Sequence, residues 1–229
     1  MAKLKKQVLG KVSGALGDIV FREVNGKNVV GMKPSNVKVP NDPESIARRA
    51  KFALSAKLAQ AIALHPELKV FWKSKAPSGL STHNYIIKSN YINVLPDGIT
   101  DFVKLLPAAG FPVTSSNISV SDQFVRVELD AIGTNNNINP AVETQIEMLS
   151  IVFLTQPVDE SVDDYSIISA SSGNLALDLN NAILFTAPLV GNDELLFGKY
   201  QTNKSFSAFV TKDAAGNVIN FSNTLPLLP

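Results

Sequence analysis

The pattern of apolar and polar positions changes near Asp97-Gly98. Beyond that point, short β-branched runs alternate with turn residues, and Phe124–Asp130 places apolar side chains at every second position, as a half-buried strand does. Asp213–Asn217 has the composition of a hairpin loop. This spacing predicts an antiparallel β-sandwich of immunoglobulin or fibronectin type III character. The predicted strands are residues 118–121, 124–130, 146–155, 166–170, 175–179, 183–186, 195–200, 205–212 and 218–222.

A helical period precedes this β-rich half. Asp42 and Pro43 form a helix start, a capping carboxylate followed by proline at the first position. Shorter helices are predicted over Glu67–Lys75 and from a cap near Ser81 to just before Pro96. In the first helix, which runs to about Leu64, one apolar face is formed by Ile46, Ala50, Ala53, Leu54, Leu58, Ala61 and Ile62.

The first forty residues predict a hairpin. Two strand-like runs, Asp18–Val24 and Lys27–Met32, flank Asn25-Gly26, a pair that favours the two-residue turn with positive φ. Residues 33–43 follow as an extended arm, because its prolines disfavour helix. A lone hairpin is marginal in water, so this one is expected to join a larger sheet or a neighbouring subunit.

The sequence therefore predicts an α+β protein with two parts. Residues 1–96 form an N-terminal β-hairpin, an extended arm and a helical segment, and residues 97–229 form the antiparallel β-sandwich. The charge divides in a similar way. Residues 1–75 carry fifteen Lys/Arg against five Asp/Glu, whereas residues 76–229 carry six against fifteen. A basic surface favours anionic partners and an acidic surface favours cationic ones.

Chemistry-bearing residues are few. The chain lacks cysteine, and its two histidines, His65 and His83, have no catalytic signature around them. The acidic run Asp159–Asp164 lacks the spacing of a calcium loop and is interpreted as a solvated turn. These observations favour a protein that is not an enzyme and predict no catalytic residue, cofactor or metal. No signal peptide and no membrane span are expected, so we expect a virion or cytoplasmic location without membrane contact.

Several short motifs resemble an uncharacterised family of Bacteroidetes and their phages. At the start these are Gly10–Val20, Asn25-Gly26-Lys27, Met32-Lys33-Pro34 and Arg49–Phe52. Near the end they are Ser207–Asp213 and Asn220–Asn223. The resemblance implies a glycine-rich N-terminal hairpin, a helical segment and a C-terminal fibronectin- or immunoglobulin-like domain. It implies no catalytic residue.

Our leading hypothesis is a non-enzymatic structural subunit of a large assembly, most plausibly a bacteriophage virion or phage-like particle. Its partners would be further copies of itself, docked head to tail, or other structural proteins of the assembly. The expected assembly contacts are Ile19, Phe21, Asn25, Gly26, Val29 and Val30.

The alternative is a nucleic-acid-binding module that uses the basic segment, with Phe71 and Trp72 available for stacking on bases. We favour head-to-tail docking, because it accounts for both charge excesses and nucleic-acid binding accounts for one. The basic contact face is expected to comprise Lys3, Lys5, Lys6, Lys11, Arg48, Arg49, Lys51 and Lys57.

Overall fold

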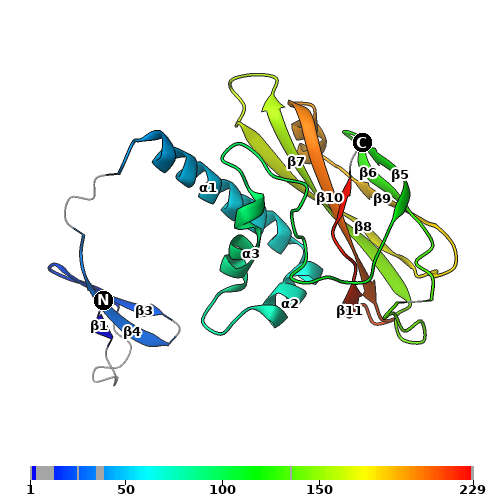
Figure 1. Ribbon diagram of the computed structural model, residues 1–229, viewed down its shortest axis with the longest axis horizontal. Coiled ribbons are helices and arrows are strands. Elements are labelled where there is room, and N and C mark those ends of the chain that lie inside the picture. Colours follow the sequence, from blue (N-terminus) through cyan, green and yellow to red (C-terminus); the bar gives the residue numbers. More distant parts are fainter. Residues whose placement is uncertain (1, 4–12, 25, 35–38, 135, 228–229) are drawn as a thin grey trace. The chain divides into compact units, whose positions relative to one another are not determined.

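The computed structural model describes residues 2–3, 13–24, 26–34, 39–134 and 136–227 (Figure 1). The chain forms two compact units, Met1–Ile46 and Ala47–Pro229. The sequence predicts a boundary near residues 95–98 instead. The units divide differently because the predicted helical segment packs against the β-rich part and shares a core with it.

The first unit is built on one antiparallel sheet with strand order β1-β4-β3-β2. The pairing of Val24 with Lys27 confirms the predicted hairpin, and Gly26 lies between these two strands with φ +74°. A two-residue turn at Gly17-Asp18 joins β2 to β3. The strands are β1 (Ala2–Lys3), β2 (Gly14–Leu16), β3 (Ile19–Val24) and β4 (Lys27–Met32).

The predicted helix starts are confirmed. A carboxylate oxygen of Asp42 accepts a hydrogen bond from the Ser45 backbone N–H at 2.9 Å, and the Ser81 hydroxyl accepts one from the Asn84 N–H at 3.2 Å. The helices are α1 (Pro43–Leu64), α2 (Pro66–Lys75), α3 (Thr82–Asn90) and the 3₁₀ turn η1 (Tyr91–Asn93).

Two antiparallel sheets form the rest of the second unit, which confirms the α+β class. The larger has the order β11-β10-β7-β8, with β12 also paired to β10, and the smaller has the order β5-β6-β9. The larger sheet contains β7 (Gln145–Pro157), β8 (Tyr165–Ala176), β10 (Tyr200–Lys212), β11 (Val218–Phe221) and β12 (Leu225–Leu227). The smaller contains β5 (Ser115–Val120), β6 (Phe124–Leu129) and β9 (Ile183–Pro188), and a short helix, α4 (Asn192–Phe197), precedes β10.

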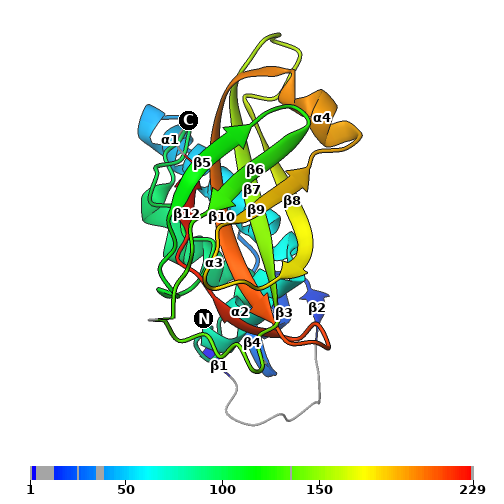
Figure 2. The ribbon, with the colours of Figure 1, turned by 90° about the vertical axis from the view of Figure 1, so that its right-hand side faces the viewer.

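Strand β7 lies at the centre of this unit and is buried on both faces. Side chains such as Ile151 and Phe153 share a core with α1, α2 and α3, whereas Val152 and Leu154 share a second core with the smaller sheet. Figure 1 shows α2 and α3 on one side of β7 and β10, with β5 and β6 on the other, and Figure 2 shows the smaller sheet face-on. Helices cover one face of the larger sheet and strands cover the other.

Two predicted strand assignments are wrong. Residues 195–200 were expected to form a strand, but Leu195 and Leu196 belong to α4, whose first turn carries Asp193 and Glu194. Negative side chains at a helix start are favourable, and a short apolar pair does not distinguish helix from strand. The runs at 166–170 and 175–179 belong to one sheet segment, because β8 continues from Tyr165 through Gly173, at φ +71°, to Ala176.

Candidate functional site

The sheet of the first unit exposes its apolar side chains. Among the described residues up to Ile46, no apolar side chain is buried. Leu16 is 72% exposed, Met32 73%, Val24 50% and Ile19 38%. A strand pattern with this apolar content normally covers a core, so the sheet has an apolar surface that the described residues of its own unit leave open.

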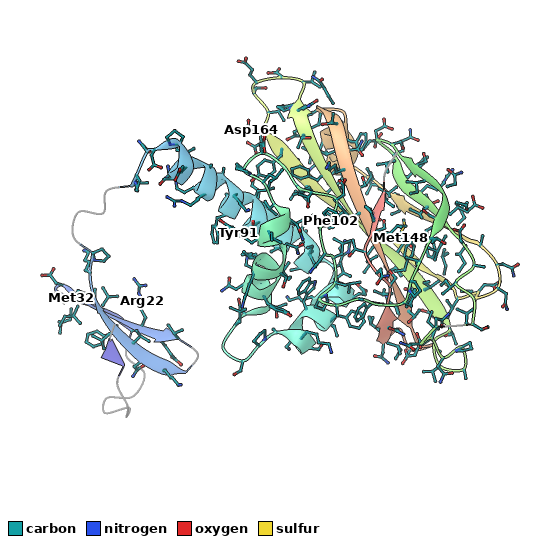
Figure 3. The ribbon with its side chains drawn as sticks, viewed as in Figure 1. Arg22, Met32, Tyr91, Phe102, Met148 and Asp164 are labelled. Carbon is teal, nitrogen blue, oxygen red and sulfur yellow. The ribbon has the colours of Figure 1, made fainter. Side chains whose placement is uncertain are left out.

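A groove of about 680 Å³ lies on this unit. Val20 pairs with Gly31 and Arg22 pairs with Val29, so these four residues face the same side of the sheet. The groove is lined by Ile19, Val20, Arg22, Val29, Val30, Gly31, Met32 and Pro34. We name this the N-terminal groove. The described residues that line it are apolar apart from Arg22, which is exposed, so the groove suits an apolar segment that carries a negative charge (Figure 3 labels Arg22 and Met32).

Three of the six predicted assembly contacts, Ile19, Val29 and Val30, line the N-terminal groove. Phe21 is half-buried on the same strand, and Gly26 is exposed in the hairpin turn. Asn25 lies outside the described residues. Contact with a partner stays a prediction for all six. The sequence did not point to Arg22, Met32 or Pro34, because only the folded sheet brings them together.

Strand β2 forms an edge of this sheet, and within the described residues it pairs only with β3. Gly14, Ala15 and Leu16 are all exposed. The outer side of an edge strand presents backbone N–H and C=O groups to which another strand can bind. The first unit therefore combines an open sheet edge with an open apolar groove.

The structure describes five of the eight residues of the predicted basic contact face, and contact with a partner stays a prediction for all eight. Lys57 lies 4.6 Å from the ring centroid of Tyr165, with its Nζ 3.9 Å from an Asp163 oxygen, and Lys51 lies 4.6 Å over Tyr91. These lysines contact their own chain. Arg48 and Arg49 are exposed on α1, and Lys3 belongs to β1. Lys5, Lys6 and Lys11 lie outside the described residues.

Of the two aromatic residues proposed for base stacking, Trp72 is buried inside the second unit, so that expectation is wrong for Trp72, and Phe71 is partly buried. Trp72 is fully buried, and its indole N–H donates to the Leu105 carbonyl at 2.8 Å. The ring of Phe71 meets that of Phe221 with centroids 4.4 Å apart. On α2 the buried side chains are Leu68 and Trp72, which are four residues apart and therefore lie on the same face of the helix.

One end of the larger sheet is strongly acidic. Asp159 to Asp164 form an exposed turn, as the sequence predicts, with the Val162 N–H bonded to the Asp159 carbonyl at 3.1 Å. Helix α4 lies beside this turn, because Val158 N–H donates to the Lys199 carbonyl at 2.9 Å and the Tyr200 hydroxyl to the Asp163 carbonyl at 3.0 Å. Figures 1 and 2 both show the β7–β8 turn and α4 at the same end of the larger sheet. We name residues 158–164 and 190–195 the acidic end.

The acidic end also carries apolar side chains. Val158 is 63% exposed, Val190 68% and Leu195 66%. Burial, followed by the charges of Asp163 and Asp164, raises the pKa of Tyr165 and Tyr200 above the ordinary tyrosine value. The pKa of Asp159 is lowered by hydrogen bonds from Ser161. This end therefore has a negative potential around uncovered apolar groups.

A buried ionic cluster joins α2 to the larger sheet. Lys212 on β10 binds Glu147 on β7 and, at 3.1 Å, Glu67 on α2, and its side chain is 7% exposed. Burial alone would raise the pKa of Glu67, but hydrogen bonds from its own backbone N–H and from Lys212 hold this pKa below its ordinary value. Burial alone would lower the pKa of Lys212. The hydrogen bonds and negative charges of Glu147 and Glu67 outweigh this effect, so the pKa of Lys212 is raised.

The two histidines differ in environment. His65 lies at the junction of α1 and α2, as the sequence indicates, but is buried, with Nε2 3.4 Å from the Ser150 carbonyl oxygen. Burial lowers the pKa of His65. His83 is exposed on α3. In the described part of the chain no three His, Cys, Asp or Glu residues are placed to hold a metal ion.

Comparisons with protein-family models, with curated proteins and with solved structures found no match to this chain. Within the described residues, no helix is both long enough and apolar enough to span a membrane.

Proposed function

We propose that this protein is a non-enzymatic structural subunit of a large assembly and that it assembles through the sheet of its first unit. The observation that carries the proposal is the uncovered apolar surface of that sheet. Strands β2, β3 and β4 expose Leu16, Ile19, Val24 and Met32, and no apolar side chain of the unit is buried within the described residues.

Burial of these side chains against a partner would supply a substantial driving force. Covering a large aliphatic side chain contributes about 1.5–3 kcal/mol. A small sheet with no core of its own is at best marginally stable in water. A partner that covers the sheet would therefore stabilise the subunit and the contact together, and the open edge of β2 offers strand addition as a further means of attachment.

Within this proposal, the second unit is the body of the subunit. Antiparallel pairing of the named strands and a core shared between two sheets support a sandwich of immunoglobulin or fibronectin type III character, to which helices α1–α3 add a further layer. The resemblance of the sequence motifs to a family of Bacteroidetes and their phages favours a bacteriophage virion or phage-like particle as the assembly. The location would then be the virion, or the cytoplasm before assembly.

Hydrogen exchange and limited proteolysis on the full chain test the proposal. In a dilute monomer we expect rapid amide exchange over β2–β4 and cleavage between residues 33 and 42, with slow exchange over β7 and β10. A dilute monomer in which the first forty residues resist both exchange and protease would contradict the proposal, since the sheet would then need no partner.

A matched pair of variants sharpens this test. Met32→Asp places a charge in the N-terminal groove at a side chain that is 73% exposed, and Leu184→Asp makes the same kind of change at a 55% exposed position on β9. Neither variant should unfold the protein. We expect Met32→Asp to abolish assembly and Leu184→Asp to leave it intact.

A further inference from the structure

We infer that the segment filling the N-terminal groove is the acidic end of a second copy of this chain, so that subunits join head to tail. This inference rests on the proposed function, since it takes the first unit as the assembly surface, and it adds the identity of the partner and the place on that partner that binds.

The two units carry opposite charge. Residues 1–46 have eight Lys/Arg against four Asp/Glu, and residues 47–229 have thirteen against sixteen. The negative charge of the second unit gathers at the acidic end, where Asp159, Glu160, Asp163, Asp164, Asp193 and Glu194 lie beside Lys57 and Lys199. Opposite charge steers the two surfaces together and disfavours contacts between two grooves or between two acidic ends.

The surfaces also match in their apolar character. Among the residues that the structure describes, the N-terminal groove offers apolar walls and the guanidinium of Arg22. The acidic end offers Val158, an exposed side chain in a short turn, followed directly by Asp159 and Glu160. With Val158 in the groove, the neighbouring carboxylates come within reach of Arg22. Arginine binds carboxylates with two parallel hydrogen bonds, so this contact would fix orientation as well as add affinity.

The groove and the acidic end are different surfaces of one chain, so their contact is heterologous. Each bound subunit keeps one free groove and one free acidic end. Such a contact continues from copy to copy and produces a ring if the rotation closes and a filament if it does not.

Sedimentation velocity on full-length variants tests the inference. The groove variant is Arg22→Glu, and the end variant is Glu160→Lys/Glu194→Lys, at exposed side chains of the acidic end. Asp97→Lys/Asp130→Lys is the control for the end variant, because it changes the net charge by the same amount as the end variant but at positions outside the acidic end. The wild-type chain should form species larger than a dimer at low salt and dissociate at high salt. Each of the first two variants should raise the dissociation constant about tenfold or more, and the control should not.

Mixing gives the decisive readout. The groove variant keeps an intact acidic end, and the end variant keeps an intact groove. The two altered surfaces also carry opposite charges, so an equal mixture of the variants should recover the assembly that each variant lacks alone. Assembly by the end variant as well as by wild type, with loss in Arg22→Glu, would overturn the inference while leaving the first unit as the assembly surface. A wild-type chain that stays monomeric at low salt would also overturn the inference, and the exchange experiment on the monomer would then decide the proposed function separately.

Discussion

The two units of this protein bury their apolar residues to opposite extents. In the second unit, β7 is covered on both faces, and side chains such as Phe153 and Phe209 are buried completely. In the first unit, the described strands have a similar content of valine, isoleucine and phenylalanine, yet none of these side chains is buried. Strand propensity therefore forms both kinds of sheet, but among the described residues only the second unit has a buried core of its own. This difference is why we propose the first unit as the one that binds a partner.

The largest expected effect comes from removing a core aromatic residue. Phe209→Ala empties a site between the two sheets, where the Phe209 ring lies 5.0 Å from that of Phe185, and should cost about 3–5 kcal/mol of unfolding free energy. Phe21→Ala in the first unit should cost no more than about 1 kcal/mol, because its ring has no core around it. Urea denaturation followed by circular dichroism measures both. Equal losses would mean that the first unit shares in the cooperative core.

Next in size is the buried ionic cluster. Lys212→Met leaves Glu147 buried without its cation and should cost about 3 kcal/mol. The matched variant Lys204→Met breaks an exposed pair with Asp101, in which both side chains are about half exposed, and should cost less than about 1 kcal/mol. The same denaturation experiment applies. A small effect of Lys212→Met would show that water or a rearranged neighbour replaces the lysine.

A smaller effect is expected from acid. The buried neutral His65 has a lowered pKa, so below about pH 6.5 the unfolded chain takes up a proton that the folded chain does not. Stability should therefore fall with decreasing pH by at most about 1.4 kcal/mol per pH unit. Glu67, whose folded pKa is depressed, adds a further loss as the pH falls below about 4.5.

Denaturation midpoints measured between pH 7.5 and 5.5 test this dependence. His65→Gln should flatten the profile, whereas the exposed His83→Gln should leave it as in the wild type. If the wild-type profile is flat over this range, the histidine at the α1–α2 junction takes up its proton equally in both states.

The smallest expected effect on stability is that of removing residues 1–40, which contain the strands of the first unit. A chain that begins at Asn41 keeps the Asp42 cap of α1 and all the side chains of both cores. Its unfolding free energy should match that of the full chain to within about 1 kcal/mol, and its assembly should be lost. A large loss of stability would show that the first forty residues are part of the body's fold.

Local signals predicted the local structure well. Asn25-Gly26 specified the hairpin turn, Asp42-Pro43 the start of α1, and the alternation in Phe124–Asp130 the strand β6, because each depends on backbone conformations that neighbouring residues set. These signals failed where the same short residue pattern is compatible with two kinds of secondary structure. Leu195-Leu196 suits a strand or a helix, and Gly14–Leu16 became the strand β2 only through pairing with β3.

The candidate surfaces were predictable only in part. The opposite charges and the acidic turn at Asp159–Asp164 are visible in the sequence, since charge is a property of composition. The neighbourhood of that turn is not visible, because α4 reaches it through the pairing of β7 with β10. For the same reason the sequence gave no sign that Trp72 would face Leu105 rather than solvent.

By itself, the sequence determined the α+β class, the hairpin, the helix starts and the separation of charge, because these follow from short-range backbone preferences and from composition. Tertiary structure alone decided that the helices cover β7 and β10, and that Glu67 meets Lys212 across 145 positions. It also decided that the apolar strands of the first unit stay uncovered within the described residues. Burial depends on which surfaces come into contact in the folded chain. Contacts between residues far apart in sequence cannot be predicted from the local sequence around either residue.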